Sequence, residues 1–569
     1  MIKENQIQTG YVHSITSNAP YQSDPLCVYQ TLCQGSKNNL LLESAEIDKK
    51  HLLKSLLLVD AAVKIVCHGN IVTFNALSQN GKNALKFAQQ QLAKHAQLHL
   101  LKLDHNADQL IVTFSAIPAD LDENSRLKAI NPFQSLRLFN QLKNVNQHPF
   151  SVFLGGVFAF DMMSMSEQLP NVPDGENTCP DFVYYLAETI VVIDHEKQHS
   201  EIIGNVFSFT DNSSSQQNTE AKQDIQQRIH QIKSQLQQNS VVETSSSNNT
   251  TNNIETNISK TSVAEINAPE ISVDISDEKY CQIVEQLKEN IRAGDIFQVV
   301  PSRTFSLPCA DTIAAYQALK LSNPSPYMFY LNDSDFCIFG ASPESAIKYQ
   351  QHTSSGERQV EIYPIAGTRP RGFTADGKFS PDLDSRIELD LRLDKKELAE
   401  HIMLVDLARN DIARVCKAGT RHVADLLKVD RYSHVMHLVS RVCGTLSDDL
   451  DALHAYQACM NMGTLSGAPK VKATELIRFV EGKRRGSYGG AVGYITGTGE
   501  MDTCIVIRSA FVKDGIAQVQ AGAGVVFDSD PQAETNETRQ KAQAVLSAIQ
   551  ASAIQASTIT SAKQIAEQK

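Results

Sequence analysis

The sequence lacks several features that would place it in other classes of protein. Its 569 residues include no tryptophan, and no run approaches the roughly 18 apolar residues that a membrane-spanning helix needs. The eleven cysteines contain no C-x-x-C pair, which argues against structural zinc and against a disulfide framework. The net charge of −12 argues against nucleic-acid and membrane-surface partners. The first residues do not show the charged and then apolar pattern of a signal peptide, so we expect a cytoplasmic protein.

The chain divides by composition into four stretches, and its 42% hydrophobic residues can bury a sizeable core. Residues 1–210 alternate β-like and helical runs, which is typical of an α/β or α+β region. Residues 211–270 combine a helix, with an apolar stripe from Ile225 to Leu236, and a polar low-complexity linker or insertion. Residues 271–549 are the densest in motifs, and we expect residues 550–569 to form a frayed tail.

A buried helix is predicted for Arg392–Asp411, RLDKKELAEHIMLVDLARND. This stretch has no glycine or proline and is rich in Leu, Ala, Glu and Lys. Apolar residues cover most of its circumference, which is typical of a helix inside the protein. Glu397 and Glu400 nevertheless lie three residues apart and therefore on one side of it. Because an unpaired buried carboxylate is costly, we expect positive charge to face this pair.

A second pair of glutamates, Glu534 and Glu537, repeats the E-x-x-E spacing in PQAETNETRQKAQAVL. A salt bridge is the usual explanation for one such pair. Two pairs without a surplus of nearby lysines instead favour a hard divalent cation, and Mg²⁺ is the first candidate. Magnesium held by a few carboxylates usually completes its coordination with an anionic substrate. The sequence therefore predicts a magnesium site and an anionic substrate.

Three further features are weak when taken singly. The Gly-rich turns GTLSGAPK (463–470) and AGAG (521–524) expose N–H groups that can bind an anion, although most such turns are only turns. Arg508 interrupts the apolar strand CIVIRSAFV, where it suits either a carboxylate ligand or a buried salt bridge. His437, in RYSHVMHLVSRV, is a core histidine unless a site surrounds it.

The order and wording of the motifs resemble the family of chorismate-utilising enzymes. The resemblance covers roughly residues 271–549 and rests on PIAGTRPRG, DKKELAEHIMLVDLARND, VMHLVSRVCGTL, GTLSGAPK, YGGAVGY, IVIRSA and QAGAGVVFDSDPQAETNE. It implies an α+β catalytic domain of two antiparallel β-sheets with outer helices and an active-site cleft between them. It also implies Mg²⁺ and chorismate, a dianion, in agreement with the cation and the anion expected from the glutamates.

Two positions distinguish the branches of this family. Isochorismate- and salicylate-forming members place a water-activating lysine in the strand that here reads DIFQVVPSR, and this chain has Gln298. Aminodeoxychorismate-forming members resemble PIKGT where this chain reads PIAGT, so Ala366 leaves the space of their lysine open for ammonia. Both departures indicate the branch that forms anthranilate and pyruvate from chorismate and ammonia. An aminodeoxyisochorismate or aminodeoxychorismate synthase and a non-catalytic tryptophan sensor are the alternatives.

The resemblance implies a role for each residue of the site. Glu344 would protonate the departing C4 hydroxyl of chorismate, and His437 would polarise the same oxygen, with Gln298 beside them as a third catalytic candidate. Magnesium would be held directly by Glu400 and Glu537, with its waters oriented by Glu397 and Glu534. The residues that would bind chorismate are Gly367, Thr368, Thr464, Tyr488, Arg508, Gly522, Ala523, Gly524 and Lys541.

Two stretches resemble the tryptophan-feedback elements of this branch: NNLLLESAE (38–46) and SNPSPYMFYL (322–331). Ser44 as a helix cap and Tyr327 as a core residue are simpler explanations, but the joint occurrence of the two stretches favours regulation. The absence of tryptophan from the chain is consistent with an enzyme made when tryptophan is scarce. The tryptophan site would use Leu40, Leu42, Tyr327 and Met328 as an apolar slot, and Glu43, Ser44 and the backbone around Pro326 as polar contacts.

Glutamine hydrolysis is not expected from this chain, because no cysteine lies in a nucleophile-elbow setting. Cys443, in RVCGTL, is followed by glycine but belongs to the synthase motifs. The resemblance therefore implies a separate glutamine amidotransferase subunit, which forms a heterotetramer with this chain and passes ammonia to it through a closed path.

Overall fold

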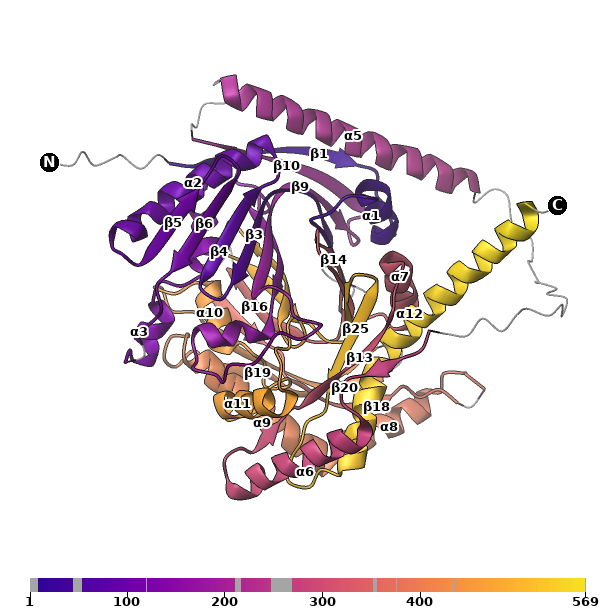
Figure 1. Ribbon diagram of the computed structural model, residues 1–569. Coiled ribbons are helices and arrows are strands. Elements are labelled where there is room, and N and C mark those ends of the chain that lie inside the picture. The colour runs from indigo at the N-terminus through magenta and orange to yellow at the C-terminus, as the bar shows by residue number, and fades with distance from the viewer. Residues whose placement is uncertain are drawn as a thin grey trace.

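The computed structural model describes residues 9–44, 54–118, 120–209, 216–246, 269–351, 356–374, 376–432 and 435–567. None of the helices in these ranges is both long and apolar enough to cross a lipid bilayer. Strands form the interior of the molecule, and helices cover them from outside (Figure 1).

Two long antiparallel strands, β3 (Lys54–His68) and β9 (Phe182–Asp194), form the centre of the sheet. β9 is rich in β-branched and aromatic residues and β3 contains β-branched Val and Ile, which favour strands, and most of the side chains in both are buried. Their register shifts three times between Leu58 and Val63. Such irregularities bend and twist a strand, and the neighbours of the central pair change at this point.

The first wing of the sheet is attached to residues 54–58 of β3 and to residues 189–194 of β9, which lie on the same side of these irregularities. Its pairings are antiparallel, except for a parallel contact between β1 and β7. The order is β7 (Lys143–Asn144), β1 (Tyr11–Ala19), β10 (His199–Ser208), β9, β3, β2 (Asn39–Glu43), β14 (Tyr327–Asn332), β15 (Cys337–Ser342), β24 (Ser509–Lys513), β25 (Ile516–Gly522), β13 (Ser302–Pro308) and β11 (Ser272–Val273).

The second wing extends from the other half of the same two strands and is antiparallel throughout. The order is β5 (Leu101–His105), β6 (Gln109–Phe114), β4 (Ile71–Ala76), β3, β9, β8 (Phe153–Phe158), β22 (Ala491–Thr496), β23 (Met501–Ile505), β16 (Ser345–Gln351), β17 (Arg358–Ile362) and β20 (Val435–Thr445). β20 also pairs with β18 (Ile365–Pro370) and β19 (His422–Arg431). A separate ribbon consists of β12 (Gln298–Val299) and β21 (Gly467–Ala468).

The predicted α+β architecture with antiparallel sheets is confirmed, but the two sheets are not separate. They are joined through β3 and β9, and each contains strands from the first 210 residues. β2 pairs with β14 in the first wing, and β8 pairs with β22 in the second. Strands outside the predicted catalytic domain of residues 271–549 therefore contribute to both wings. Without β2 and β8, the neighbouring strands would leave backbone N–H and C=O groups unpaired at an edge.

Helix α9 (Lys395–Ala413) carries the first glutamate pair and begins slightly later than predicted. The expected burial on nearly all sides is wrong, because Leu404 and Val405 are buried whereas Ile402 is 46% exposed. Asp394 accepts hydrogen bonds from the N–H groups of Lys396 and Glu397 and so caps the helix. The residues before this cap belong to a separate helix, α8 (Pro381–Leu393).

Helix α12 (Pro531–Glu567) begins with the second glutamate pair and packs against α6 (Asp277–Ala293), α7 (Thr312–Ser322) and β25. The structure differs from the expected frayed tail, because the helix continues beyond residue 550 to Glu567. Figure 1 shows this helix running from the lower part of the molecule outward.

Helix α5 (Gln216–Ser246) lies across the first wing next to β10 and β1 (Figure 1). The stripe from Ile225 to Leu236 that the sequence indicated is buried there. The remaining helices are α1 (Pro25–Cys33), α2 (Gln79–Gln97), α3 (Glu123–Lys128), α4 (Gln134–Arg137), α10 (Ala452–Cys459) and α11 (Lys470–Glu481), with 3-10 turns η1 (Leu138–Gln141) and η2 (Phe160–Met165).

Candidate active site

The four glutamates predicted to surround magnesium come from α9 and α12 and influence one another's ionisation. Burial raises the pKa of Glu400 to about 7; Lys396 opposes the rise, and the negative charges of Glu397, Glu534 and Glu537 add to it. Burial also raises the pKa of Glu534, and Glu537 contributes to that rise. Carboxylates that disfavour one another's charge in this way lie within electrostatic reach.

Basic side chains partly neutralise this cluster. Arg369 Nη1 lies 3.0 Å from Glu397 Oε1, and Lys541 Nζ lies 2.6 Å from Glu537 Oε1. Within the described part of the chain, no three acidic, histidine or cysteine side chains are arranged to hold a metal ion, so the magnesium site stays a prediction. The donor set fits magnesium, because carboxylates are hard oxygen ligands and the charges of Glu397, Glu534 and Glu537 add to the effect of burial on the pKa of Glu400.

A second group of predicted residues meets where β25 ends. Arg508 donates from Nη1 to the carbonyl of Lys541 (2.9 Å), and Lys541 donates from Nζ to the carbonyl of Gly522 (3.1 Å). A Cβ added to Gly522 would lie 3.1 Å from the hydroxyl of Tyr488. Burial lowers the pKa of Arg508 and raises the pKa of Tyr488 to about 12. The structure thus places two cations and a neutral phenol around one stretch of backbone.

The predicted anion-binding turn at residues 522–524 is partly occupied by contacts within the protein. The N–H group of Ala523 donates to the carbonyl of Pro301 (3.3 Å). A Cβ added to Gly524 would lie only 2.9 Å from Nε2 of Gln298, so glycine allows this close approach. Gln298 itself is buried. Its Oε1 finds no hydrogen-bond partner among the residues that the structure describes, which leaves an acceptor for a ligand.

Glu344 links β15 to β16 and faces α9. Thr464 donates from Oγ1 to Glu344 Oε1 (3.1 Å), and the two residues line a small cavity together with Leu404 and Asp411 of α9. Burial raises the pKa of Glu344 to about 8, although Thr464 and Lys541 oppose the rise. The carboxyl group is therefore mostly protonated at pH 7, as a general acid requires.

His437 lies opposite Thr368 in the pairing of β18 with β20. Its Nδ1 is 3.2 Å from the carbonyl oxygen of Gly367 and 3.0 Å from Thr368 Oγ1. A carbonyl only accepts, so this contact places the hydrogen on Nδ1 and leaves Nε2 as an acceptor. Burial lowers the pKa of His437 to about 4; the bond to Gly367 opposes this change, and Arg508 adds to it. The imidazole is therefore neutral at pH 7.

Charge interactions join these groups into one site. The charge of Lys541 lowers the pKa of Glu344, and the charge of Arg508 lowers the pKa of His437. Lys541 also forms an ion pair with Glu537 of the glutamate cluster. The predicted residues therefore combine a cluster of carboxylates, two fixed cations, a protonated carboxyl group and a neutral imidazole. This arrangement suits a substrate with two carboxylates and a leaving group that must be protonated.

The predicted feedback elements pair directly with each other, since Met328 lies opposite Glu43 in the register of β14 with β2. Ser44 donates from Oγ to the carbonyl of Pro326 (3.0 Å). The side chain of Glu43 is engaged elsewhere, because Lys320 Nζ lies 2.6 Å from its Oε2.

The predicted apolar slot is divided between two clusters. Leu40, Leu42 and Tyr327 share one of them, whereas Met328 belongs to the cluster on the other side of the strands. Tyr327 also donates to Asp502 Oδ1 (3.3 Å). Asp502 was not predicted, although an acidic residue in the strand MDTCI is unusual enough to have marked it.

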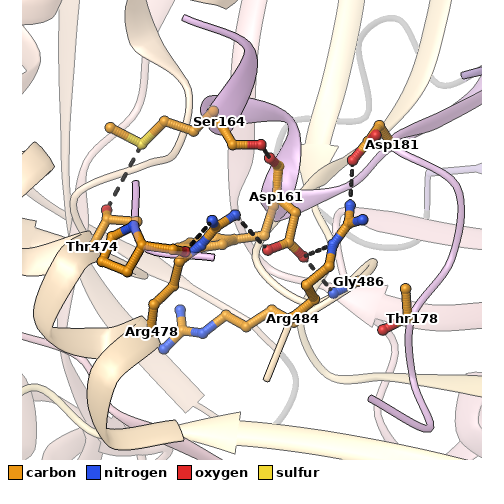
Figure 2. A network of polar contacts seen from close by, with 12 residues as sticks. Asp161, Ser164, Thr178, Asp181, Thr474, Arg478, Arg484 and Gly486 are labelled. Atoms are coloured by element: carbon orange, nitrogen blue, oxygen red, sulfur yellow. Dashed lines mark hydrogen bonds and ion pairs between the residues drawn. The ribbon is translucent and has the colours of Figure 1, made fainter. Parts of the chain in front are cut away.

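A buried charged network was also missed by sequence reasoning. Asp161 accepts from Arg478 Nη2 (3.0 Å) and from the N–H group of Gly486 (2.9 Å), and Arg484 lies between Asp161 and Asp181 (Figure 2). Arg478 in α11 and Arg484 in KRRGSYGG were the only indication in the sequence. Their acidic partners lie about 300 residues earlier, so no local pattern connects them.

Comparison with known proteins identifies the family. Residues 92–547 match the family of chorismate binding enzymes. Anthranilate synthase component 1 of Vibrio cholerae is 54% identical over 543 residues, covering 95% of this chain and 97% of that protein. Its Escherichia coli counterpart is 50% identical over 547 residues, covering 96% and 98%. The crystal structure of anthranilate synthase component I from Streptococcus pneumoniae has 27% identity and a TM-score of 0.61, covering 87% and 92%. The chain belongs to the chorismate-binding enzyme family and, within it, to the anthranilate synthase component 1 group.

Proposed function

We propose that this chain converts chorismate and ammonia into anthranilate and pyruvate at the site described above. Its relatives carry the name of this activity. The observation that carries the site is the grouping of Arg508, Lys541 and Tyr488 beside the protonated Glu344 and the glutamates of α9 and α12. Chorismate has two carboxylates and a leaving hydroxyl group. The cations and the magnesium proposed at the glutamates complement the carboxylates, and the protonated Glu344 complements the hydroxyl group.

The two carboxylates of chorismate bind at different places. The enolpyruvyl carboxylate lies against Arg508 and the hydroxyl of Tyr488, where a guanidinium fork and a neutral donor are available. Lys541 binds nearby and exchanges its bond to Gly522 for one to the substrate. The ring carboxylate is directed toward the glutamate cluster.

Glu400 and Glu537 would hold Mg²⁺, and Glu397 and Glu534 would orient its waters. When bound, the ion neutralises the ring carboxylate and withdraws charge from the ring. Arg369 keeps Glu397 in place through its ion pair. The pair between Lys541 and Glu537 opens when the ion and the substrate are present, because the lysine is then needed at the substrate.

Glu344 and His437 act on the C4 hydroxyl group. Ammonia adds at C2 while the C4–O bond breaks, and the proton of Glu344 leaves with the oxygen as water. The ammonium group formed at C2 then loses one proton to solvent, from which Glu344 is reprotonated. His437 carries its hydrogen on Nδ1, toward Gly367. Its Nε2 accepts a hydrogen bond from the same hydroxyl group and so fixes the orientation of that group. Elimination of pyruvate from the aminated ring then gives the aromatic amine.

Gln298 receives the nucleophile. Its Oε1 has no hydrogen-bond partner in the described structure and can accept a hydrogen bond from ammonia. It cannot deprotonate water as the lysine of the isochorismate-forming enzymes does, so ammonia is preferred over water. Ala366 leaves open for ammonia the space that a lysine fills in the aminodeoxychorismate-forming enzymes.

A glutamine amidotransferase subunit supplies the ammonia, and tryptophan inhibits the reaction from the pocket around β2 and β14. The name component 1 of the relatives supports a second component. The bond between Ser44 and Pro326 supports contact between the two feedback elements, and the apolar slot in this proposal consists of Leu40, Leu42 and Tyr327.

Incubation of the purified protein with chorismate, magnesium and an ammonium salt tests the proposal. Anthranilate fluorescence and one equivalent of pyruvate should appear together. An aminated, non-aromatic product without pyruvate would identify an aminodeoxyisochorismate synthase instead, and no turnover of chorismate with tryptophan binding intact would identify a sensor.

A further inference from the structure

One arginine outside the residues discussed so far contacts several segments of the proposed chorismate site. Arg485 follows α11 and is buried, with a relative exposure of 2%. Its Nη1 donates to the carbonyl of Leu465 (2.7 Å), and its Nη2 donates to the carbonyl of Val300 (2.6 Å). The guanidinium carbon lies 5.5 Å from the centre of the Tyr488 ring. Each contact adjoins a site residue, since Leu465 follows Thr464 and Val300 lies on the segment of Gln298.

Glu481 extends these contacts to a fourth segment. It accepts from Arg485 Nε at 2.9 Å through Oε2, and its Oε1 accepts from both the N–H group and the hydroxyl of Ser302 at 2.8 Å. Ser302 lies opposite Gly522 in the pairing of β13 with β25. The buried pair of Arg485 and Glu481 thus connects the segments that carry Gln298, Thr464, Tyr488 and Gly522.

Stability alone does not account for this arrangement. A buried ion pair stabilises a fold little, or not at all, compared with apolar residues of the same volume. Arg485 nevertheless directs two of its hydrogen bonds to backbone carbonyls of loops, where a planar fork with fixed angles sets the spacing of the segments. A lysine has the same charge but cannot hold both carbonyls in this geometry.

We infer that Arg485 is a positioning residue for the reaction: together with Glu481, it fixes the relative positions of the four segments that contact chorismate. The inference rests on the proposed function, because it takes the site residues from there. Misplacement of reacting groups by about 1 Å can lower a rate by about 10²-fold. Loss of the guanidinium fork should therefore reduce turnover even in a protein that remains folded.

Arg485→Lys tests the inference, and Arg478→Lys is the matched control. Arg478 is also buried and ion-paired, but its bonds lead to Asp161 and to the carbonyl of Pro170, not to site residues. We expect kcat/KM for chorismate to fall about 10²-fold in Arg485→Lys and to stay near the wild-type value in Arg478→Lys. Both variants should lose stability to urea by similar amounts, since each loses a comparable buried contact.

Several results would overturn the inference. Equal losses of activity in the two variants, in proportion to the folded fraction, would show that Arg485 is only structural. If Arg485→Lys does not fold, Glu481→Gln decides, because the amide keeps the shape and one acceptor; normal kcat/KM in that variant contradicts the inference. Arg508→Gln distinguishes failure of the proposed site from failure of the positioning role. If Arg508→Gln is fully active, the proposed site is wrong. If Arg508→Gln is inactive and Arg485→Lys is normal, only the positioning role is contradicted.

Discussion

Among single residues, Glu344 has the most direct consequence for the pH dependence of the reaction. Its pKa is raised to about 8 by burial, so the protonated form that acts as the acid is present below pH 8 and is lost above it. We expect kcat at constant free ammonia to fall as the pH rises through about 8. Below pH 8, Glu344→Gln should lower kcat by about 10²- to 10⁴-fold, the usual contribution of a general acid.

The concentration of free ammonia must be held constant in this measurement, because deprotonation of ammonium raises it over the same pH range. Thr464→Val serves as a check on the cause. The bond from Thr464 lowers the pKa of Glu344, so its removal should move the descending limb to higher pH. If kcat falls at the same pH in Glu344→Gln and in Thr464→Val as in the wild type, the titrating group is not Glu344.

The glutamate cluster gives a second prediction at this scale. Glu400→Gln or Glu537→Gln should abolish turnover, because each removes a proposed magnesium ligand, while the fold persists. The unfolding temperature of Glu400→Gln without metal should equal or exceed that of the wild type, since the variant removes a carboxylate whose charge is disfavoured by burial and by its neighbours.

Activity against magnesium concentration and thermal unfolding with and without a chelator measure these effects. Glu285→Gln on α6 is a suitable control, because Glu285 is exposed. Near-normal activity of Glu400→Gln at limiting magnesium would show that the metal, if it is required, binds elsewhere.

At the scale of elements, the pairing of β2 with β14 determines what a substitution at Ser44 does. Ser44→Phe should fill the pocket and remove the bond to Pro326, giving an enzyme with near-normal turnover that tryptophan no longer inhibits. Ser44→Ala removes the same bond but leaves the space, so inhibition should weaken and persist. Full inhibition of Ser44→Phe by tryptophan would place the regulatory site elsewhere.

Reciprocity provides an independent measurement on the wild type. Coupling between two such sites typically amounts to about 1–3 kcal/mol. Tryptophan should weaken chorismate binding by the same factor by which chorismate weakens tryptophan binding, and calorimetry of each ligand in the presence of the other measures both.

Sequence reasoning succeeded where a residue's neighbours are set by local periodicity. The helix around Glu397 and Glu400 and the buried stripe of α5 follow from helical spacing. It failed where the partner is distant in sequence. Asp161 and Arg478 meet across 317 residues, and the joining of both sheets through β3 and β9 depends on long-range strand pairing. Met328 and Tyr327 are neighbours in β14 and lie in different apolar clusters, as alternation along a strand requires.

At the scale of the whole molecule, the chain should use ammonia but not glutamine. Most of the cysteines that the structure describes are buried, and burial raises the pKa of Cys443 to about 12, which disfavours the nucleophilic thiolate. The isolated protein should form anthranilate from ammonium salts at alkaline pH and none from glutamine. Addition of an amidotransferase subunit should restore the use of glutamine, and glutamine-dependent activity of this chain alone would contradict the prediction.

The joining of the two wings through β3 and β9 also means that the halves of the chain are complementary fragments. Residues 1–246 contain β2 and β8, and residues 269–569 contain their partners β14 and β22. Produced alone, each piece would present open strand edges and should aggregate. Produced together, the two polypeptides should assemble without a covalent connection and recover activity, so that a gene divided between these segments would still encode a working enzyme.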